Sequence, residues 1–372
     1  MRRWDIFCKV VDNYGDVGVC WRLARQLAAE HGVVVRLFLD DVSALATIWP
    51  EFNPNLDGQM VAGVTVLHWS DASDWSNMAV ADVVVEGFAC GLPESYVQAM
   101  LAQKKSSGAS ARWANLEYLS AEAWVAGCHL LDSPQASGLT KTFFFPGFTN
   151  QTGGLLREAY IKAEVPPEKY YGEQGDALKI SLFGYEAMPL KQWLPCLVNA
   201  PQTTVLAVTS GKASAAMRAA WQELGYDGEQ QGALTLRYLP MLTQLEFDEL
   251  LQVSDVNFVR GEDSLVRAIW AERVLTWHIY PQDDGVHMDK LSAFSTVYGG
   301  FFEQSHQNDL REVFDHWQMA WNGDVRYDLA QAWAAFRTHL PLLVQGAHEV
   351  ASGLRQTEDL AQQLLRWSES SR

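Results

Sequence analysis

One stretch near the N-terminus indicates the fold: WDIFCKVVDNYGDVGVCWRLARQLAAEHGVVVRLFLDD, at positions 4–41. Its apolar, β-branched start predicts a buried strand, and DNYGDVGV (12–19) then interrupts the pattern with two glycines. CWRLARQLAAEH restores apolar residues at helical spacing before Gly32, a residue type that commonly ends helices. VVVRLFLDD predicts a second strand. Strand, glycine-containing loop, helix and strand together indicate the start of a parallel βαβ unit.

The same alternation of strands and helices is predicted twice along the 372 residues. The aromatic- and glycine-rich FFFPGFTNQTGG (143–154) and the polar VPPEKYYGEQGD (165–176) come between the two series, which favours a boundary near residue 160. We therefore predict an α/β protein with two Rossmann-like domains, residues 1–160 and 161–345. A helix within residues 346–372 is expected either to pack back on the first domain or to cap the chain.

Charge and cysteine content exclude several classes of protein. The chain has 28 Lys and Arg against 45 Asp and Glu, a formal charge of -17, which repels nucleic acid and anionic lipid and favours a cationic target. The five cysteines form no CxxC pair, so neither a disulfide framework nor a zinc site is predicted. No signal-peptide core and no apolar run of membrane-spanning length occurs. We expect a cytoplasmic protein without a nucleic-acid or membrane partner.

The loop after the first predicted strand contains two carboxylates, Asp12 and Asp16, and two glycines, Gly15 and Gly18. Ligands of parallel sheets bind at the carboxyl ends of strands, and the glycines permit a close backbone path there. The carboxylates form a candidate acid/base or cation-binding pair. The alternative is that Asp12 caps the turn and Asp16 caps the helix.

A dinucleotide site is less favoured in this loop, because the full GxGxxG spacing is missing. Asp40 and Asp41 end the second strand at a distance that suits a ribose contact, but the fingerprint remains incomplete. The pattern therefore argues against a dehydrogenase.

The segment VRGEDSLVRA (259–268) predicts a second ligand loop at a strand end. Gly261 permits a sharp turn, and Glu262, Asp263 and Ser264 follow at a helix N-terminus, where backbone N–H groups bind anions. This arrangement suits a diphosphate, with Arg260 and Arg267 as candidate cationic contacts. The alternative is an ordinary helix start with solvated arginines.

Aromatic residues at two further positions are candidates for binding a base or sugar. Phe183 and Tyr185 flank a glycine at a strand end, although buried core rings are the alternative. Gln244 and Phe247 lie three apart at a predicted helix start and suit recognition and stacking of a pyrimidine, or an ordinary helix surface or core. The polar segment YPQDDGVHMDK (280–290) has no metal-ligand spacing, so no bound metal is expected.

Six segments together resemble the bacterial protein-arginine rhamnosyltransferase family that modifies elongation factor P, and the resemblance runs almost end to end. The segments are WDIFCKVVDNYGDVGVCWRLARQLA, WANLEYLSAEAWV, FFFPGFT with TGGLLRE, FVRGEDSLVRA and IYPQDDGVH. The resemblance implies a GT-B fold, with two Rossmann-like domains that face each other across a cleft. It also implies an N-terminal domain that binds the protein acceptor and a C-terminal domain that holds dTDP-β-L-rhamnose, with no cofactor.

The family's functional residues carry over onto matching positions of this chain. By this resemblance Asp12, Asp16 and Glu262 are the essential acids. The nucleotide-sugar is expected at Tyr185, Gln244, Phe247, Arg260, Asp263 and Ser264, with Phe183 and Gly261 beside them. The implied product is an α-linked rhamnosyl-arginine on an elongation factor P active on ribosomes stalled at polyproline.

Residue chemistry agrees with this expectation. An arginine guanidinium holds its proton firmly, so its attack requires a proton acceptor, and a carboxylate suits that role. Our hypothesis is that Asp16 is the general base of an inverting transfer, that Asp12 orients the guanidinium and that Glu262 holds the sugar. Two alternatives remain: a glycosyltransferase with a carbohydrate or small-molecule acceptor, and a non-catalytic docking protein.

Overall fold

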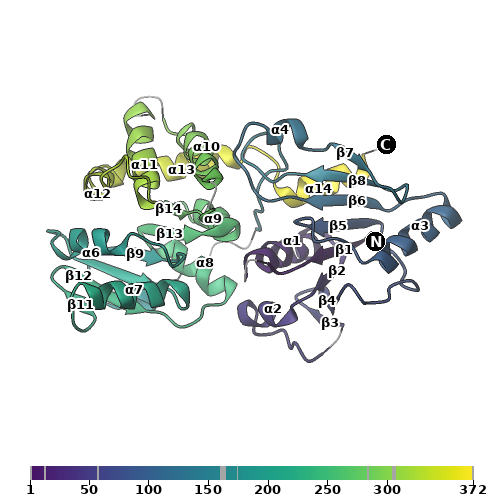
Figure 1. Cartoon of the computed structure of the whole chain (residues 1–372), viewed down its shortest axis with the longest axis horizontal. Coiled ribbons are helices and arrows are strands. Elements are labelled where there is room, and N and C mark those ends of the chain that lie inside the picture. The colour runs from purple at the N-terminus through teal and green to yellow at the C-terminus, as the bar shows by residue number, and fades with distance from the viewer. Residues whose placement is uncertain are drawn as a thin grey trace. The chain divides into compact units, whose positions relative to one another are not determined.

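The computed structural model describes residues 2–11, 14–56, 58–159, 165–173, 175–282, 285–303 and 307–370. The chain forms two compact units (Figure 1): unit 1 comprises Met1–Ala159 and Thr357–Arg372, and unit 2 comprises Tyr160–Gln356. The prediction for Asp12 lies outside the described residues. Among the described helices none has the length and apolar character needed to span a bilayer.

Unit 1 is built on one mainly parallel sheet. The strands are β1 (Arg3–Cys8), β2 (Val34–Leu39), β3 (Gln59–Val61), β4 (Val64–His68), β5 (Val83–Gly87), β6 (Arg112–Leu116), β7 (Asp132–Pro134) and β8 (Thr140–Phe144). Their order is β3-β4-β2-β1-β5-β6-β8-β7, and only β3 and β7, at the edges, pair antiparallel within the described sheet. The six parallel strands follow the doubly wound Rossmann order, in which the first strand of the chain lies centrally.

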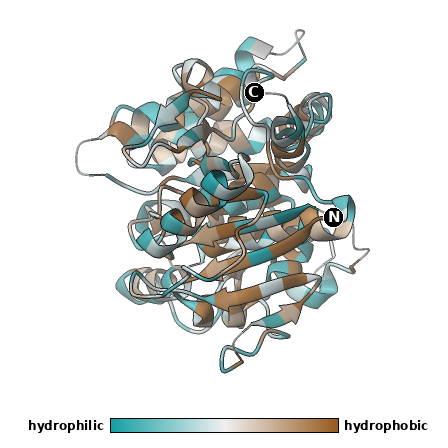
Figure 2. Cartoon of the chain, turned by 90° about the vertical axis from the view of Figure 1, so that its right-hand side faces the viewer, coloured by the Kyte–Doolittle hydropathy of each residue, from teal (hydrophilic) through white to brown (hydrophobic). Residues whose placement is uncertain are grey.

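Helices cover both faces of the unit 1 sheet. They are α1 (Gly15–His31), α2 (Val42–Ile48), α3 (Glu94–Ser107), α4 (Val125–Cys128) and α14 (Leu360–Glu369). Apolar side chains of α1, α2 and α14 pack on one face, and those of α3 pack on the other. Because both faces are buried, the strands are hydrophobic along most of their length, as their brown colour in Figure 2 shows.

The predicted end of α1 is confirmed. Gly32 caps the helix in the left-handed region, with φ of 62°, and its N–H donates to the carbonyl of Leu27. Glycine adopts this conformation without the steric cost that a Cβ adds.

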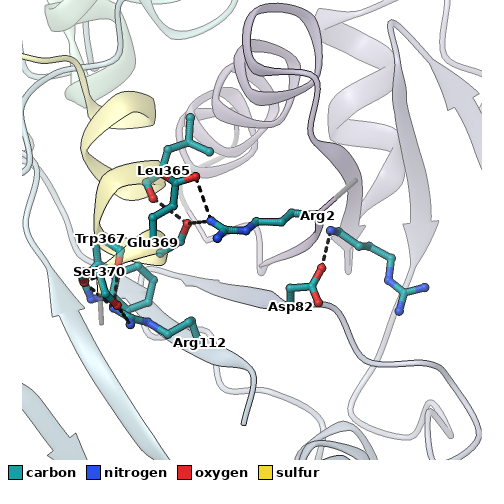
Figure 3. Close-up of polar contacts among 9 residues, drawn as sticks. Arg2, Asp82, Arg112, Leu365, Trp367, Glu369 and Ser370 are labelled. Atoms are coloured by element: carbon teal, nitrogen blue, oxygen red, sulfur yellow. Dashed lines mark hydrogen bonds and ion pairs between the residues drawn. The ribbon is translucent and has the colours of Figure 1, made fainter. Parts of the chain in front are cut away.

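The last helix, α14, belongs to unit 1 although its sequence follows unit 2. Its apolar face, with Leu364 and Trp367, is buried against the sheet. Arg112 donates to the carbonyls of Trp367 at 2.5 Å and Ser370 at 2.8 Å, and Arg2 pairs with Glu369 at 3.1 Å (Figure 3). Cationic side chains stabilise the carbonyl end of a helix, so these contacts fix α14 at the amino ends of the strands.

Unit 2 contains a second, smaller sheet with the order β11-β12-β10-β9-β13-β14. The strands are β9 (Leu178–Leu182), β10 (Thr204–Val208), β11 (Gln230–Gln231), β12 (Leu234–Tyr238), β13 (Val256–Arg260) and β14 (Val274–His278). All described pairs are parallel except the edge hairpin of β11 and β12. The first strand of this unit, β9, again lies centrally, so unit 2 repeats the doubly wound arrangement.

The helices of unit 2 lie on both faces of this sheet. They are α5 (Glu168–Tyr171), α6 (Leu190–Val198), α7 (Lys212–Glu223), α8 (Gln244–Val253), α9 (Gly261–Trp270), α10 (Val286–Gly299), α11 (Gln307–Trp321), α12 (Leu329–Thr338) and α13 (Leu340–Leu354). Residues of α5 and α8 pack on β10, whereas Trp193 of α6 packs among Phe258, Trp321 and Trp333. The segment 346–372 therefore comprises the end of α13, in unit 2, and α14, in unit 1.

Candidate functional site

The carboxyl ends of β1 and β5 form the switch point of the unit 1 sheet. β1 pairs with β2 on one side and with β5 on the other, and the chain reaches these two neighbours by crossovers in opposite directions. Loops diverge at such a point and leave a crevice, where ligands of open α/β sheets bind. Asp16 follows β1 at this edge and Phe88 follows β5.

Asp16 lies in the first turn of α1, and its side chain is held from two directions. Its Oδ2 accepts the backbone N–H of Val11 at 2.8 Å, and its Oδ1 lies 3.4 Å from the hydroxyl of Tyr118. The residue is only 3% exposed. The N-cap of α1 is Tyr14, so Asp16 does not cap the helix as the alternative interpretation required. The N-terminal end of the helix dipole favours a negative charge at this position.

The glycines of the first loop do not lie where the sequence placed them. Gly15 begins α1, and the N–H of Gly18 donates to the carbonyl of Tyr14, so both belong to the first helical turn and not to an extended loop. Helix α1 therefore begins at Gly15, earlier than the sequence predicted. The backbone hydrogen bond from Gly18 to Tyr14 closes its first turn although that turn contains two glycines.

The two aspartates after β2 have structural roles. Asp40 accepts the N–H of Val10 at 2.8 Å, and Asp41 caps α2 through the N–H of Ser43 at 2.9 Å. Both carboxylates therefore fix neighbouring backbone. The pKa of the buried Cys8 thiol is raised well above its usual value, first by a hydrogen bond with Cys20, then by burial, and further by the negative charges of Asp16 and Asp40.

In unit 2 the switch point lies between β9 and β13, and it gathers most of the residues predicted to hold a nucleotide-sugar. The guanidinium of Arg260 lies 4.4 Å from the ring centre of Phe183 and 4.8 Å from that of Tyr185. Its Nη1 donates to the carbonyl of Gly184 at 3.1 Å. The cation is therefore stacked between aromatic rings at a strand end, where it can hold an anion.

The first turn of α9 follows directly after Arg260. Gly261 adopts φ of +64°, a left-handed conformation that lets the chain turn from β13 into the helix. Ser264 is buried, accepts the N–H of Arg260 at 3.1 Å and donates to the carbonyl of the same residue. Asp263 lies in this turn. Glu262 forms an ion pair with Lys290 of α10, with 2.9 Å between Oε1 and Nζ. The pairing of Glu262 with Lys290 was not predicted from the sequence.

The predicted helix start at Gln244 is confirmed. Thr243 and Glu246 form a reciprocal capping box that begins α8 at Gln244. Gln244 and Phe247 therefore share the first turn, and the ring of Phe247 lies 5.2 Å from that of Phe183. This contact brings α8 to the same strand-end region as Arg260.

Arg267 has a different role from the one considered for it. Its Nε and Nη2 donate to the two carboxylate oxygens of Asp248 at 3.0 and 2.9 Å, and both side chains are buried. This bidentate pair joins α8 to α9, so Arg267 is a structural residue. Arg267 lies three positions after Ser264, on the same face of α9, so the sequence did not distinguish the two roles.

His278, at the end of β14, is a residue of this region that the sequence did not single out. Its Nδ1 accepts the backbone N–H of Tyr185 at 3.1 Å, and its ring packs edge-on to Tyr185. Burial, and then the positive charge of Arg260, lower the pKa of His278 to about 4. The imidazole is therefore neutral near pH 7 and acts as an acceptor that orients the loop after β9.

The described residues contain no group of three or more His, Cys, Asp or Glu side chains placed to hold a metal ion. Arg260 supplies a positive charge at the unit 2 switch point, and Lys290 forms an ion pair with Glu262.

Comparison with known protein families identifies the family of this chain. The model of the family described as Elongation-Factor P (EF-P) rhamnosyltransferase EarP matches residues 4–369. The chain belongs to this family. It is 45% identical to a protein-arginine rhamnosyltransferase of Pseudomonas putida and 43% identical to one of Pseudomonas aeruginosa, with 99% of each chain covered.

Solved structures agree with this membership. The EarP chain of a structure on EarP-mediated arginine glycosylation of translation elongation factor EF-P is 32% identical and superposes with a TM-score of 0.67 over 100% of both chains. MurG of Acinetobacter baumannii, at 13% identity and a TM-score of 0.51 over 99% of both chains, shares the fold alone. The fold class is that of the GT-B glycosyltransferases, as predicted, with a Rossmann-like sheet in each unit.

Proposed function

We propose that this EarP-family chain transfers L-rhamnose from dTDP-β-L-rhamnose to an arginine side chain of EF-P, with inversion at the anomeric carbon. The observation that carries the proposal is the family match over residues 4–369, which includes both switch points. The modified EF-P is then active on ribosomes stalled at polyproline, and the reaction takes place in the cytoplasm.

Unit 2 is proposed to bind the donor. Phe183 and Phe247, both partly exposed, supply flat surfaces for the thymine or the sugar, with Gln244 as a polar partner of the base. Tyr185 is only 3% exposed and is proposed to support this pocket through its contact with Arg260. Arg260 and the N–H groups of the first turn of α9 suit the diphosphate, because positive charge and the N-terminal end of a helix both attract phosphate oxygens. With these groups the leaving dTDP is stabilised without a metal.

Unit 1 is proposed to bind the acceptor. Arginine keeps its proton at neutral pH, with a pKa above about 12, so a guanidinium nitrogen attacks only as a proton is withdrawn from it. Asp16 is a buried carboxylate of fixed orientation and suits this task. Asp12, outside the described residues, is proposed to orient the same guanidinium.

The proposed step is a single displacement. The guanidinium nitrogen forms a bond to the anomeric carbon of rhamnose while the bond from that carbon to the β-phosphate oxygen breaks. The nitrogen's proton passes to Asp16, and the electron pair of the broken bond leaves with dTDP. Glu262, held by Lys290, is proposed to hold the sugar during this step.

Intact-mass measurement of EF-P, after incubation with the enzyme and dTDP-rhamnose, tests the proposal. We expect a gain of one deoxyhexose residue on an arginine. An enzyme that consumes the donor but leaves EF-P unchanged would point to a carbohydrate or small-molecule acceptor. A chain that binds EF-P but neither binds nor consumes a nucleotide-sugar would be a docking protein. Calorimetry with dTDP-rhamnose, dTDP-glucose and a UDP-sugar tests the donor pocket separately.

A further inference from the structure

An aromatic pair lies beside Asp16 at the carboxyl edge of the unit 1 sheet. Phe88 directly follows β5, and Tyr118 lies two residues after the end of β6. Their rings are stacked, with centroids 4.5 Å apart and 18° between the planes. Tyr118 nevertheless remains 43% exposed. A half-exposed ring at a switch point, backed by a second ring, is a surface suited to a ligand.

The backbone holds Phe88 in an uncommon conformation. Phe88 has φ of +54° and Ala89 has φ of +51°, and residues with a Cβ rarely adopt this left-handed region, least of all in succession. The N–H of Phe88 donates to the carbonyl of Leu116 at 2.7 Å, which joins the end of β5 to the end of β6. Such conformations persist where the surrounding structure enforces them, and they cluster at ligand sites.

The hydroxyl of Tyr118 connects this pair to the carboxylate. It lies 3.4 Å from Oδ1 of Asp16, while Oδ2 of the same residue accepts the N–H of Val11. These two contacts fix the orientation of the Asp16 carboxylate, and a carboxylate oxygen accepts more than one hydrogen bond.

We propose that Tyr118, backed by Phe88, forms a cation subsite with Asp16 for the arginine side chain of the acceptor. The plane of the guanidinium lies on the ring of Tyr118 while its N–H groups donate to Asp16. The ring contacts the substrate, and the hydroxyl acts as a positioning group for Asp16. This inference rests on the proposed function and names the part of unit 1 that recognises the acceptor arginine.

The chemistry of the subsite favours arginine over lysine. A guanidinium is planar and weakly hydrated, so it stacks on an aromatic face while it donates in its own plane to a carboxylate. An ammonium is compact, strongly hydrated and not planar, so it gains less from the ring. A carboxylate alone binds both cations, and the aromatic pair therefore supplies the selectivity.

A double-mutant cycle of binding tests the subsite. The Kd of EF-P is measured for the wild type and for Tyr118→Leu, each with native EF-P and with EF-P whose modified arginine is replaced by alanine. We expect Tyr118→Leu to weaken native EF-P about fivefold, the size of a cation–π contact at a partly exposed site, and to leave the alanine acceptor unaffected. An equal loss for both acceptors would overturn the proposal, because the ring would then contact another part of EF-P or only support the fold.

Trp124→Leu is a matched control. Trp124 is 53% exposed in the same unit and packs on Phe145 at 5.6 Å, so its replacement also removes an exposed ring. Any change in Kd caused by Trp124→Leu should be the same for native EF-P and for EF-P with the alanine. A dependence on the acceptor arginine as large as that of Tyr118→Leu would mean that exposed rings in general, and not this subsite, sense the arginine.

Steady-state kinetics separate the ring from the hydroxyl. We expect Tyr118→Phe, which keeps the ring, to lower kcat about tenfold with the KM for EF-P unchanged, whereas Tyr118→Leu also raises that KM. The KM for dTDP-rhamnose should not change in either variant. Wild-type kinetics in Tyr118→Phe would overturn the positioning role. Failure of the proposed function itself would show differently, as wild-type enzyme that adds no deoxyhexose to EF-P.

Discussion

The two switch points of this chain have the same topology and different charges. After the first strand of unit 1, the first helical turn carries Asp16, a carboxylate that accepts a backbone N–H and lies beside a tyrosine hydroxyl. After the fourth parallel strand of unit 2, the helix begins behind Arg260, a guanidinium stacked on two rings. The first arrangement suits a cation and the second suits an anion.

This difference shows what a doubly wound sheet determines and what it leaves to its loops. The strand order places a crevice at each switch point, independently of the residues that line it. The charge of the crevice depends on a few side chains at strand ends and first helical turns, which can change without disturbing the core. One architecture used twice can therefore bind two substrates of opposite charge.

The largest effect is expected from a substitution at the switch point of unit 1. Asp16→Asn keeps the size of the side chain but removes the proposed proton acceptor, so we expect kcat to fall by about a thousandfold. Calorimetry should show unchanged binding of dTDP-rhamnose, because Asp16 belongs to unit 1. Wild-type turnover in a folded Asp16→Asn variant would remove the general-base role.

The second prediction concerns stability and the neutral histidine of unit 2. The pKa of His278 is about 4 in the folded chain and about 6.5 when unfolded, so the unfolded state binds more protons between these values. Its contribution to stability is complete above pH 6.5 and is lost as the pH falls from 6.5 towards 4. At about 1.4 kcal/mol per pH unit the loss is roughly 3 kcal/mol.

Chemical denaturation of the wild type and His278→Gln across this pH range measures the effect. The variant does not titrate there, so its free energy of unfolding should vary less steeply with pH. Equal slopes for the two proteins would show that His278 titrates normally in the folded state.

A third experiment tests the proposed anion site at the switch point of unit 2. Arg260→Met removes the cation but keeps much of the apolar stem, and we expect the KM for dTDP-rhamnose to rise about thirtyfold, the value of one charged hydrogen-bonded contact. Arg218→Met is the control, because Arg218 also stacks on a ring of unit 2, that of Tyr238 at 3.8 Å. A similar rise in both variants would assign the effect to lost stacking in general.

The smallest expected effect concerns the partner of Glu262. Lys290→Met should lower kcat about fivefold, since the ion pair is partly exposed and such pairs orient more than they stabilise. Lys290→Arg should restore most of the activity, because it keeps a cation within reach of the carboxylate. If the two variants lose activity equally, the charge on residue 290 does not position Glu262.

Prediction of the fold from sequence worked where the hydrophobic pattern is local. The strand, helix and strand of residues 4–41 were predicted from spacing, and Gly32 ends the helix as expected. By contrast, β6 and β8 were not identified, because polar residues interrupt their pattern. Lys141 of β8 pairs with Glu86 of β5 at 3.1 Å, and such cross-strand partners are invisible before the strands are ordered.

The candidate site was predicted in part. The positions of Asp16 and of the Arg260–Ser264 turn follow from strand ends and helix starts, which a single sequence shows. The partners of these residues cannot be predicted in this way. Lys290, which pairs with Glu262, and His278, which accepts the N–H of Tyr185, come from separate elements of unit 2. Arg267 was assigned to the wrong environment for the same reason, since its partner Asp248 lies on another helix.

The sequence alone determined the alternation of strands and helices, the acidic turn after the first strand and the turn from Arg260 to Ser264 at the start of α9. These features depend on residues within about one helical turn or one strand of each other, where spacing sets geometry. The tertiary structure decided which strand ends are neighbours. Arg260 contacts Gly184 across 76 residues of sequence, and Tyr118 reaches Asp16 across 102, because strand order and packing, not spacing, set those distances.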